Sequence, residues 1–319
     1  MIINYLILIA GVALVIVGAN GLVDGASSIA KRFNISNLVI GLTVVAFGTS
    51  TPELAVSVLS TLKGSTDIAI GNVIGSNILN IFLILGISAV IYPLTVHSST
   101  IWKEIPLSLL AVIMVIVTAN EVIFDGSGSA AITRSDGIIL LSFFLIFIYY
   151  SFGVAKNTRD SIHNEVKKMP VIKSVIYVVL GLTGLYFGGQ FIVESAIKIA
   201  RSFEISEAII GLTIVAVGTS LPELATSIVA AIKKNSDIAV GNVVGSNIFN
   251  VFFILGVSGL IRPLPLGNIT MVDLLVALFA SLLLFLFCFT FKGRKINRVE
   301  GLIFLVIYVV YTYYLIKVS

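Results

Sequence analysis

The motif Gly48-Thr49-Ser50-Thr51-Pro52-Glu53 recurs 170 positions later, with one substitution, as Gly218-Thr219-Ser220-Leu221-Pro222-Glu223. Each copy places a carboxylate, hydroxyl groups and a helix-breaking proline inside an otherwise apolar run. A second motif keeps the same offset, because residues 67–86 and 237–256 are identical at 15 of 20 positions. This repetition indicates a chain built from two equivalent halves, each with polar clusters set into apolar sequence.

The composition is that of a membrane protein. Of the 319 residues, 58% are hydrophobic and only 11% are charged, whereas soluble proteins carry about a quarter charged residues. Apolar runs close to the ~20 residues that span a bilayer recur along the chain. The predicted fold class is therefore an all-α polytopic membrane protein. The Lys and Arg residues are scattered over loops, so the net charge of +4 predicts no nucleic-acid partner.

Ten transmembrane helices are expected, five in each half. The only long polar connection, residues 154–172, is read as a cytoplasmic linker between a first repeat at 1–153 and a second at 173–319. Because five is odd, the second half must enter the membrane from the opposite side, which makes the halves inverted repeats. The expected spans are 3–24, 37–62, 67–92, 103–119, 135–153, 173–197, 207–232, 237–261, 271–291 and 298–317.

The loop charges predict the orientation. With the N-terminus outside, fourteen Lys and Arg residues fall in cytoplasmic segments and six in external ones. This bias follows the positive-inside rule. We therefore expect a multi-pass protein of the plasma membrane with both its N- and C-termini outside.

Glu53 and Glu223 lie near the middle of their expected spans, where a carboxylate costs on the order of 3 kcal/mol. No basic residue in the same apolar stretch is available to neutralise either one. A two-fold relation between the halves would bring both glutamates to one central place. Two carboxylates at close range in a low dielectric either share a proton or hold a cation. The two glutamates therefore predict a functional site.

Each proline is expected to open the backbone before its glutamate. Pro52 lacks an N–H, and its ring clashes with the carbonyl four residues back, so carbonyls around Ala46 to Gly48 should be free to face a ligand. Pro222 should have the same effect on residues 216–218. Hydroxyl groups within a turn of the glutamates belong to Thr49, Ser50, Thr219 and Ser220.

The second motif adds further oxygen atoms. Ser76 and Asn80 are four residues apart and share one helix face, as do Ser246 and Asn250. Carboxylate, amide, hydroxyl and carbonyl oxygens together suit a hard cation such as Ca²⁺ or Na⁺, whereas Zn²⁺ or Cu²⁺ would call for His or Cys. The sequence leaves open whether four other polar residues pack helices or belong to the site: Ser57, Ser227, Asn77 and Asn247.

The motifs G-T-S-x-P-E and G-N-x-x-G-S-N-x-x-N, each present twice, resemble the α-repeats of the cation/Ca²⁺ antiporter superfamily. The likeness is to the Na⁺/Ca²⁺ exchanger branch and its prokaryotic members, and it covers nearly the whole chain. It implies a central Ca²⁺ site flanked by Na⁺ sites, with the first and sixth helices moving together to alternate access. By motif position, it implies a ligand set of Glu53, Glu223, Ala46, Ala216, Thr49, Thr219, Ser50, Ser220, Ser76, Ser246, Asn80 and Asn250.

One position departs from part of that superfamily. Some relatives, including potassium-dependent exchangers, carry Asp where this chain has Asn250. With Asn80 and Asn250 both uncharged, the site holds two carboxylates rather than three, which argues against potassium dependence. The proton-coupled branch usually has a different sequence around its glutamate, so the match favours Na⁺.

We therefore expect a transporter rather than an enzyme, with no cofactor. It would be a secondary active antiporter that exchanges Na⁺ for Ca²⁺ and works in the bilayer as a monomer. The nearest alternative is a Ca²⁺/H⁺ antiporter that uses the same glutamates. An intramembrane hydrolase with an acidic dyad would leave the oxygen-rich shell unexplained. A passive cation channel fits inverted repeats with broken helices less well than alternating access does.

Overall fold

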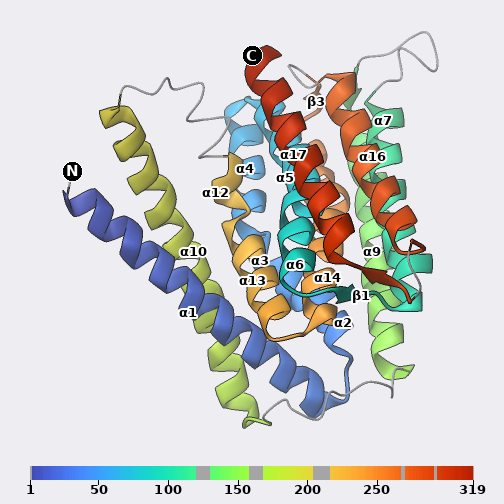
Figure 1. Ribbon diagram of the computed structural model, residues 1–319. Helices are drawn as coiled ribbons and strands as arrows, with labels where there is room; N and C mark the ends of the chain where they lie inside the picture. Colours follow the sequence, from blue (N-terminus) through green and yellow to red (C-terminus); the bar gives the residue numbers. More distant parts are fainter. Residues whose placement is uncertain are drawn as a thin grey trace.

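The computed structural model describes residues 2–119, 130–157, 168–203, 216–266, 270–290 and 293–318. Two long helices, α1 (Ile2–Phe33) and α10 (Val171–Ser202), cross each other and lean away from a bundle formed by the other helices (Figure 1). Both termini lie toward the upper end of the molecule in this view. The described elements are almost entirely helical, as the composition predicts.

Small residues allow α1 and α10 to cross in direct contact. A Cβ atom at Gly18 would lie 2.8 Å from the carbonyl oxygen of Gly181, and one at Gly11 would lie 2.9 Å from that of Gly188. The order of these contacts shows that the two helices run antiparallel. Such close backbone approach is typical of membrane helices that pack through small residues.

The two G-T-S-x-P-E motifs lie at breaks in helical spans. Between residues 37–49 and 51–63 the helix axis bends by 46°. In the second half, residues 207–215, the start of the expected seventh span, lie outside the described residues. The elements around the two breaks are α2 (Asn37–Ile40), the π-helix η1 (Gly41–Val45), α3 (Ala46–Thr49), α4 (Thr51–Lys63), α12 (Ala216–Thr219) and α13 (Leu221–Ile232).

The second motif lies in the most buried spans. Every residue of α14 is buried. In the apolar part of the span that includes α14, 78% of the residues are buried, against 17% in the last helix of the chain. These spans therefore form the core against which the other helices pack. Their elements are α5 (Thr66–Leu79), the π-helix η2 (Asn80–Leu85), α6 (Gly86–Ile91), α14 (Ser236–Ile248), the π-helix η5 (Phe249–Leu255) and α15 (Gly256–Ile261).

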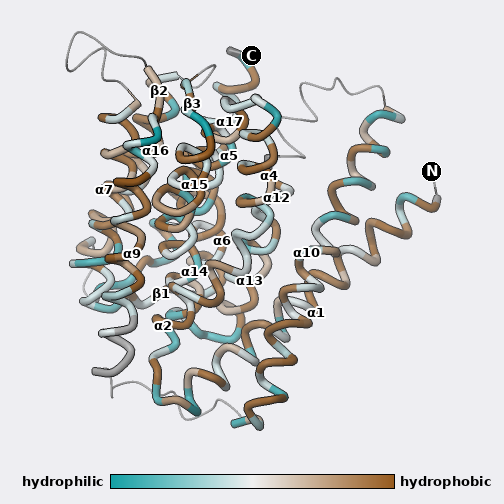
Figure 2. The backbone as a smooth tube through the Cα atoms, turned by 180° about the vertical axis from the view of Figure 1, so that it is seen from behind, coloured by the Kyte–Doolittle hydropathy of each residue, from teal (hydrophilic) through white to brown (hydrophobic). Residues whose placement is uncertain are grey.

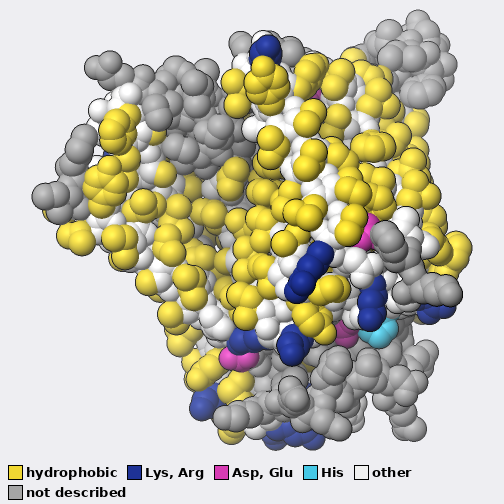
Figure 3. All heavy atoms as spheres, in the orientation of Figure 1, with side chains coloured by type: hydrophobic (Ala, Val, Ile, Leu, Met, Phe, Trp, Pro, Cys, Tyr) yellow, Lys and Arg dark blue, Asp and Glu magenta, His cyan; other side chains and the backbone are white. Residues whose placement is uncertain are grey.

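The outer helices present apolar side chains to their surroundings. Val306, Val309 and Val310 of the last helix are all strongly exposed. Figure 2 shows hydrophobic residues along the outer helices, and Figure 3 shows hydrophobic side chains over the middle of one face. Such a surface suits contact with lipid. The outer elements are the π-helix η3 (Thr100–Glu104), α7 (Ile105–Thr118), α9 (Arg134–Asn157), α16 (Met271–Phe287) and α17 (Arg298–Val318).

Two short antiparallel strand pairs join connections from different halves, and the apolar pattern predicts neither. β1 (Leu94–Thr95) pairs with β4 (Lys295–Ile296), with Leu94 opposite Ile296. β2 (Ala131–Ile132) pairs with β3 (Leu264–Pro265). Both pairs form where the backbone becomes extended after a buried span, at Tyr92 and at Arg262.

Seven helices in the described residues are long and apolar enough to cross a membrane, and the bent pair at residues 37–63 makes an eighth. Two shorter apolar helices, α13 and α16, coincide with two further expected spans. The first helix continues past its expected end at residue 24, because this part of α1 packs against α10, where Gly25 meets Ser174. The expected linker at 154–172 falls largely on residues 158–167, outside the described residues.

Candidate functional site

Each helix break is centred on one serine. Ser50 has φ −80° and ψ 7°, and Ser220 has φ −90° and ψ 9°. A proline follows two residues later in the first turn of the next helix, where its missing N–H is no loss. Glu53 and Glu223 therefore lie in the first turns of α4 and α13. Each break creates a new helix N-terminus, which stabilises the negative charge of the glutamate that follows it.

The two carboxylates are buried, and each is held by a hydroxyl group from the other half. Glu53 and Glu223 are both only 1% exposed. Ser220 Oγ donates a hydrogen bond of 2.9 Å to Glu53 Oε1, and Ser50 Oγ donates one of 2.8 Å to Glu223 Oε1. Each glutamate therefore lies against the serine at the helix break of the other half.

The second motif contributes a serine to each carboxylate. Ser220 Oγ lies 3.1 Å from Ser76 Oγ, and Ser50 Oγ lies 2.9 Å from Ser246 Oγ. Ser246 Oγ also donates a hydrogen bond of 3.4 Å to Glu223 Oε1. The structure therefore brings the hydroxyl groups of α5 and α14 to the same place as the two helix breaks.

Four buried oxygen atoms on these glutamates and on the asparagines of the second motif have no hydrogen-bond partner among the described residues. They are Glu53 Oε2, Glu223 Oε2, Asn80 Oδ1 and Asn250 Oδ1. Leaving such a group unsatisfied costs about 1–3 kcal/mol, and more if it is charged. All four atoms are acceptors, and all four residues belong to the expected ligand set. Unpaired acceptor oxygens on two carboxylates and two amides are chemically suited to a cation.

The backbone before the first break differs from the expectation. The Ala46 carbonyl is not freed, because it accepts hydrogen bonds from the Ser50 N–H at 3.0 Å and from Thr49 Oγ1 at 3.3 Å. The chain stays helical up to Thr49, so the last helical bonds form before the proline has any effect. The side chain of Ala216, its equivalent in the second half, lies outside the described residues.

Two further residues, which the sequence did not single out, support the threonines. Asn242 Nδ2 donates to the Glu223 carbonyl at 3.3 Å and to Ser227 Oγ at 3.0 Å, while its Oδ1 accepts a hydrogen bond from Thr49 at 3.1 Å. Asn72 makes the equivalent contacts in the other half. Both are the asparagine of a G-N-x-x-G sequence, which was the available signal. They also give Ser57 and Ser227, left open above, a place behind the glutamates.

The hydrogen bonds of the site recur with the two halves exchanged. Each of the following contacts, whether between the halves or within one half, is matched by a contact between the equivalent residues 170 positions away, as a two-fold relation requires. The matched contacts are Ser50–Glu223 with Ser220–Glu53, Thr49–Asn242 with Thr219–Asn72, Asn72–Ser57 with Asn242–Ser227, and Asn80–Asn247 with Asn250–Asn77.

A π-helical segment interrupts each central span at the site. The segment η2 begins at Asn80, and η5 begins one residue before Asn250. Such wide turns are rare and are frequent at functional sites, because they rotate the residues that follow around the helix axis. The four-residue spacing of Ser76 and Asn80 does not predict this change of helix type.

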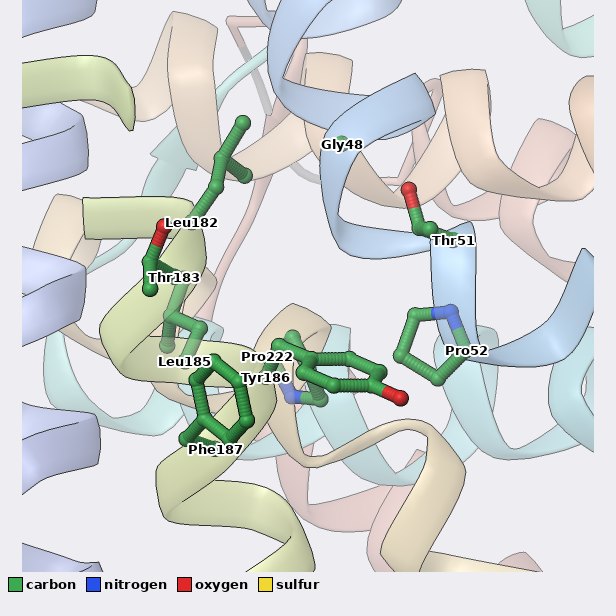
Figure 4. A pocket seen from close by; sticks show the side chains of 9 residues that line it. All are labelled: Gly48, Thr51, Pro52, Leu182, Thr183, Leu185, Tyr186, Phe187 and Pro222. Atoms are coloured by element: carbon green, nitrogen blue, oxygen red, sulfur yellow. The ribbon is translucent and has the colours of Figure 1, made fainter. Parts of the chain in front are cut away.

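A cavity of about 320 Å³ lies between α10 and the two helix breaks. Figure 4 shows Tyr186 of α10 directed toward Pro52, with Pro222 nearby. Thr51, Thr183 and the Tyr186 hydroxyl are the polar groups in a lining that is otherwise apolar. The cavity thus reaches the proline that precedes each glutamate.

The chain matches the family described as sodium/calcium exchanger protein over residues 3–153 and 173–317, which is nearly its whole length. The chain belongs to the sodium/calcium exchanger family. Both breaks and both buried central spans lie within the matched ranges. The oxygen-rich site therefore lies within the part of the chain that matches the family.

Relatives of this exchanger-family chain extend over its full length. The putative antiporter CaxA of Alkalimonas amylolytica is 39% identical over 99% of both chains. The sodium/calcium exchanger MaX1 of Methanosarcina acetivorans is 32% identical over 97% of both chains. A solved structure of the sodium-calcium exchanger NCX_Mj, soaked with 2.5 mM Na⁺ and 0.1 mM Ca²⁺, has a TM-score of 0.81 and 37% identity over 97% of each chain. The helical fold is therefore shared with an exchanger of known structure.

Proposed function

We propose that this chain is a secondary active antiporter that exchanges Na⁺ for Ca²⁺ by alternating access, with Ca²⁺ held between Glu53 and Glu223. The observation that carries the proposal is the set of four buried, unpartnered acceptor oxygens, two from these glutamates and two from Asn80 and Asn250. A divalent cation supplies the two positive charges that balance two buried carboxylates. Membership of the exchanger family, and two relatives named as sodium/calcium exchangers, support the exchange of these ions.

The charge balance explains why only loaded forms would change access. Glu53 and Glu223 carry two negative charges, and their hydrogen-bond donors in the described part of the chain are serine hydroxyl groups rather than basic side chains. A bare pair of buried charges is costly to move through a low dielectric, whereas one Ca²⁺ brings the sum to zero. Three Na⁺ ions would leave one net positive charge and make exchange electrogenic. Their ligands would be the hydroxyl groups at the breaks.

The reciprocal hydrogen bonds support ten helices arranged as two inverted five-helix repeats around this site. The end that carries the α13–α14 turn and β4 would be cytoplasmic, because Lys233, Lys234, Arg294 and Lys295 lie there. Figure 3 shows most of the visible Lys and Arg side chains toward that end. Both termini would then lie on the external side of the plasma membrane. All of the proposed ligands belong to one chain, so a monomer would suffice.

The first test is Ca²⁺ uptake into liposomes that hold the purified protein. Liposomes loaded with Na⁺ and diluted into Na⁺-free buffer at matched pH should take up radioactive Ca²⁺. Uptake should persist with a protonophore and collapse when Na⁺ is equal on both sides. Uptake driven only by an acid interior would overturn Na⁺ coupling and assign Ca²⁺/H⁺ exchange to the same two glutamates.

The site itself is tested by removing each carboxylate charge while keeping its shape. Glu53→Gln and Glu223→Gln should each abolish Ca²⁺ uptake, because one remaining charge cannot balance a divalent cation. Asp273→Asn is the matched control, since Asp273 caps α16 and bonds Tyr311 away from the breaks. Full uptake by both glutamine variants would disprove the assignment of the site.

A further inference from the structure

Four asparagines, two of them from the expected ligand set, form a brace of hydrogen bonds between the two central spans. Asn77 and Asn247, each 2% exposed, lie one helical turn before Asn80 and Asn250. Asn250 Nδ2 donates to Asn77 Oδ1, and Asn80 Nδ2 donates to Asn247 Oδ1, both at 2.9 Å. Each of these bonds crosses from one half of the chain to the other.

The orientation of the brace is fixed by two backbone carbonyls. Asn77 Nδ2 donates to the Asn247 carbonyl at 3.2 Å, and Asn247 Nδ2 donates to the Asn77 carbonyl at 3.5 Å. A carbonyl only accepts hydrogen bonds, so the amide nitrogen of each residue must face it and the amide oxygen must face away. The oxygens of Asn77 and Asn247 are thereby presented as acceptors to the next asparagine.

This order determines which atoms of Asn80 and Asn250 face the site. Because their nitrogens bind the acceptors of the brace, their oxygens point elsewhere and are the buried, unpartnered Oδ1 atoms noted above. A rotated amide at position 250 would set two acceptor oxygens against each other at Asn77 and would turn an NH₂ group toward the cation. The brace thus excludes the orientation that would repel a cation.

We propose that Asn77 and Asn247 are positioning residues that hold the amide oxygens of Asn250 and Asn80 toward the transported cation. This inference rests on the proposed function of the site. It also bears on the charge of the site, because an aspartate at position 250 would place a carboxylate oxygen against the Oδ1 atom of Asn77. The brace therefore matches asparagine at position 250 and favours a site with two carboxylates.

The test is a double-variant cycle read by equilibrium binding of radioactive Ca²⁺ to the purified protein and by the KM for Ca²⁺ uptake. Asn77→Ala should weaken Ca²⁺ binding about tenfold, because the amide of Asn250 is no longer held. The KM should rise by a similar factor, with little change in maximal rate. In an Asn250→Asp background, Asn77→Ala should cause no loss or should improve binding, since a carboxylate offers oxygen in either orientation.

The equivalent pair, Asn247→Ala with Asn80→Asp, should show the same pattern and serves where one variant fails to fold. Ser258→Ala is the matched control, because Ser258 is buried in the same span as Asn250 and has no hydrogen-bond partner among the described residues. Equal losses from Asn77→Ala in both backgrounds, or no loss in either, would overturn the positioning role. Absence of Ca²⁺ binding in the unaltered protein would instead overturn the proposed function, and the brace assignment with it.

Discussion

The Lys233 ammonium lies 2.6 Å from the Asp24 carboxylate, whereas Lys63 and Glu194, their equivalents 170 positions away in the described part of the chain, form no ion pair. Lys233 also donates to the Asn20 carbonyl, and Asn235 donates to Ser27. The α13–α14 turn is thus tied to α1 at one end of the molecule. The site is reciprocal between the halves, but this connection is not.

Under the proposed alternating access, the Asp24–Lys233 pair should break when a Lys63–Glu194 pair forms at the opposite end. Asp24→Asn should therefore favour opening at the Lys233 end and lower the KM for Ca²⁺ measured from that side. The Lys233 and Asp24 side chains are 30% and 51% exposed, so the pair contributes at most about 1 kcal/mol, and the KM should change by no more than about fivefold.

Vesicles of both orientations measure this effect, with Glu194→Gln as the matched variant. It should shift the two KM values in the opposite direction, because it weakens closure at the other end. The exchange of charges in Asp24→Lys with Lys233→Asp should restore the original values. The same shift in Asp24→Asn and Glu194→Gln would contradict the alternation of the two pairs.

The crossing of α1 and α10 should depend on Gly18 but not on Gly21. A Cβ atom at Gly18 would lie 2.8 Å from the Gly181 carbonyl oxygen and 2.9 Å from the Leu185 nitrogen, so neither backbone can yield without separating the helices. At Gly21 the nearest atom would lie 3.4 Å away, an ordinary contact. Gly18→Ala should cost about 1–3 kcal/mol through overpacking, and Gly21→Ala should be nearly neutral. Thermal unfolding in detergent, followed by size-exclusion chromatography, compares the two variants.

The helix break should depend on the proline in front of each glutamate. Pro222→Ala supplies an N–H that can bond to the Gly218 carbonyl and continue the helix through Ser220. One such bond would resist the broken geometry and should reduce Ca²⁺ uptake roughly fivefold to tenfold. Pro106→Ala is the control, because Pro106 also lies in the first turn of a helix but follows no break in the chain. Equal losses in both variants would point to a general effect on folding.

The sequence predicted the membrane class and the residues that meet at the breaks. A carboxylate within an apolar membrane span is costly, so its presence indicates a functional site. The sequence did not single out Asn72, and it left open whether Asn77 packs helices or belongs to the site. Asn72 and Asn77 belong to the same repeated motif as Ser76 and Asn80, but which of them faces the cation depends on helix rotation. That rotation changes where η2 and η5 replace regular α-helix, from Asn80 and Phe249 onward. Regular spacing carries no information about such a change.

The pH dependence of stability should be governed in part by His97, which lies between two expected membrane spans. His97 Nε2 is 3.0 Å from Asp237 Oδ1 at the start of α14. This hydrogen bond, with the negative charges of Asp237 and Glu104, raises the pKa of His97 above 6.5, although partial burial opposes the shift. A raised folded-state pKa means that the stabilisation is complete below the unfolded-state value, about 6.5, and is lost as pH rises through the folded-state value. The thermal unfolding midpoint of the protein in detergent should therefore fall as pH rises above about 6.5. The variant His97→Gln tests this assignment, because glutamine keeps a hydrogen-bond donor but cannot titrate. Its thermal unfolding midpoint should therefore change less over the same pH range.

The same pH dependence in this variant and in the unaltered protein would show that groups other than His97 are responsible.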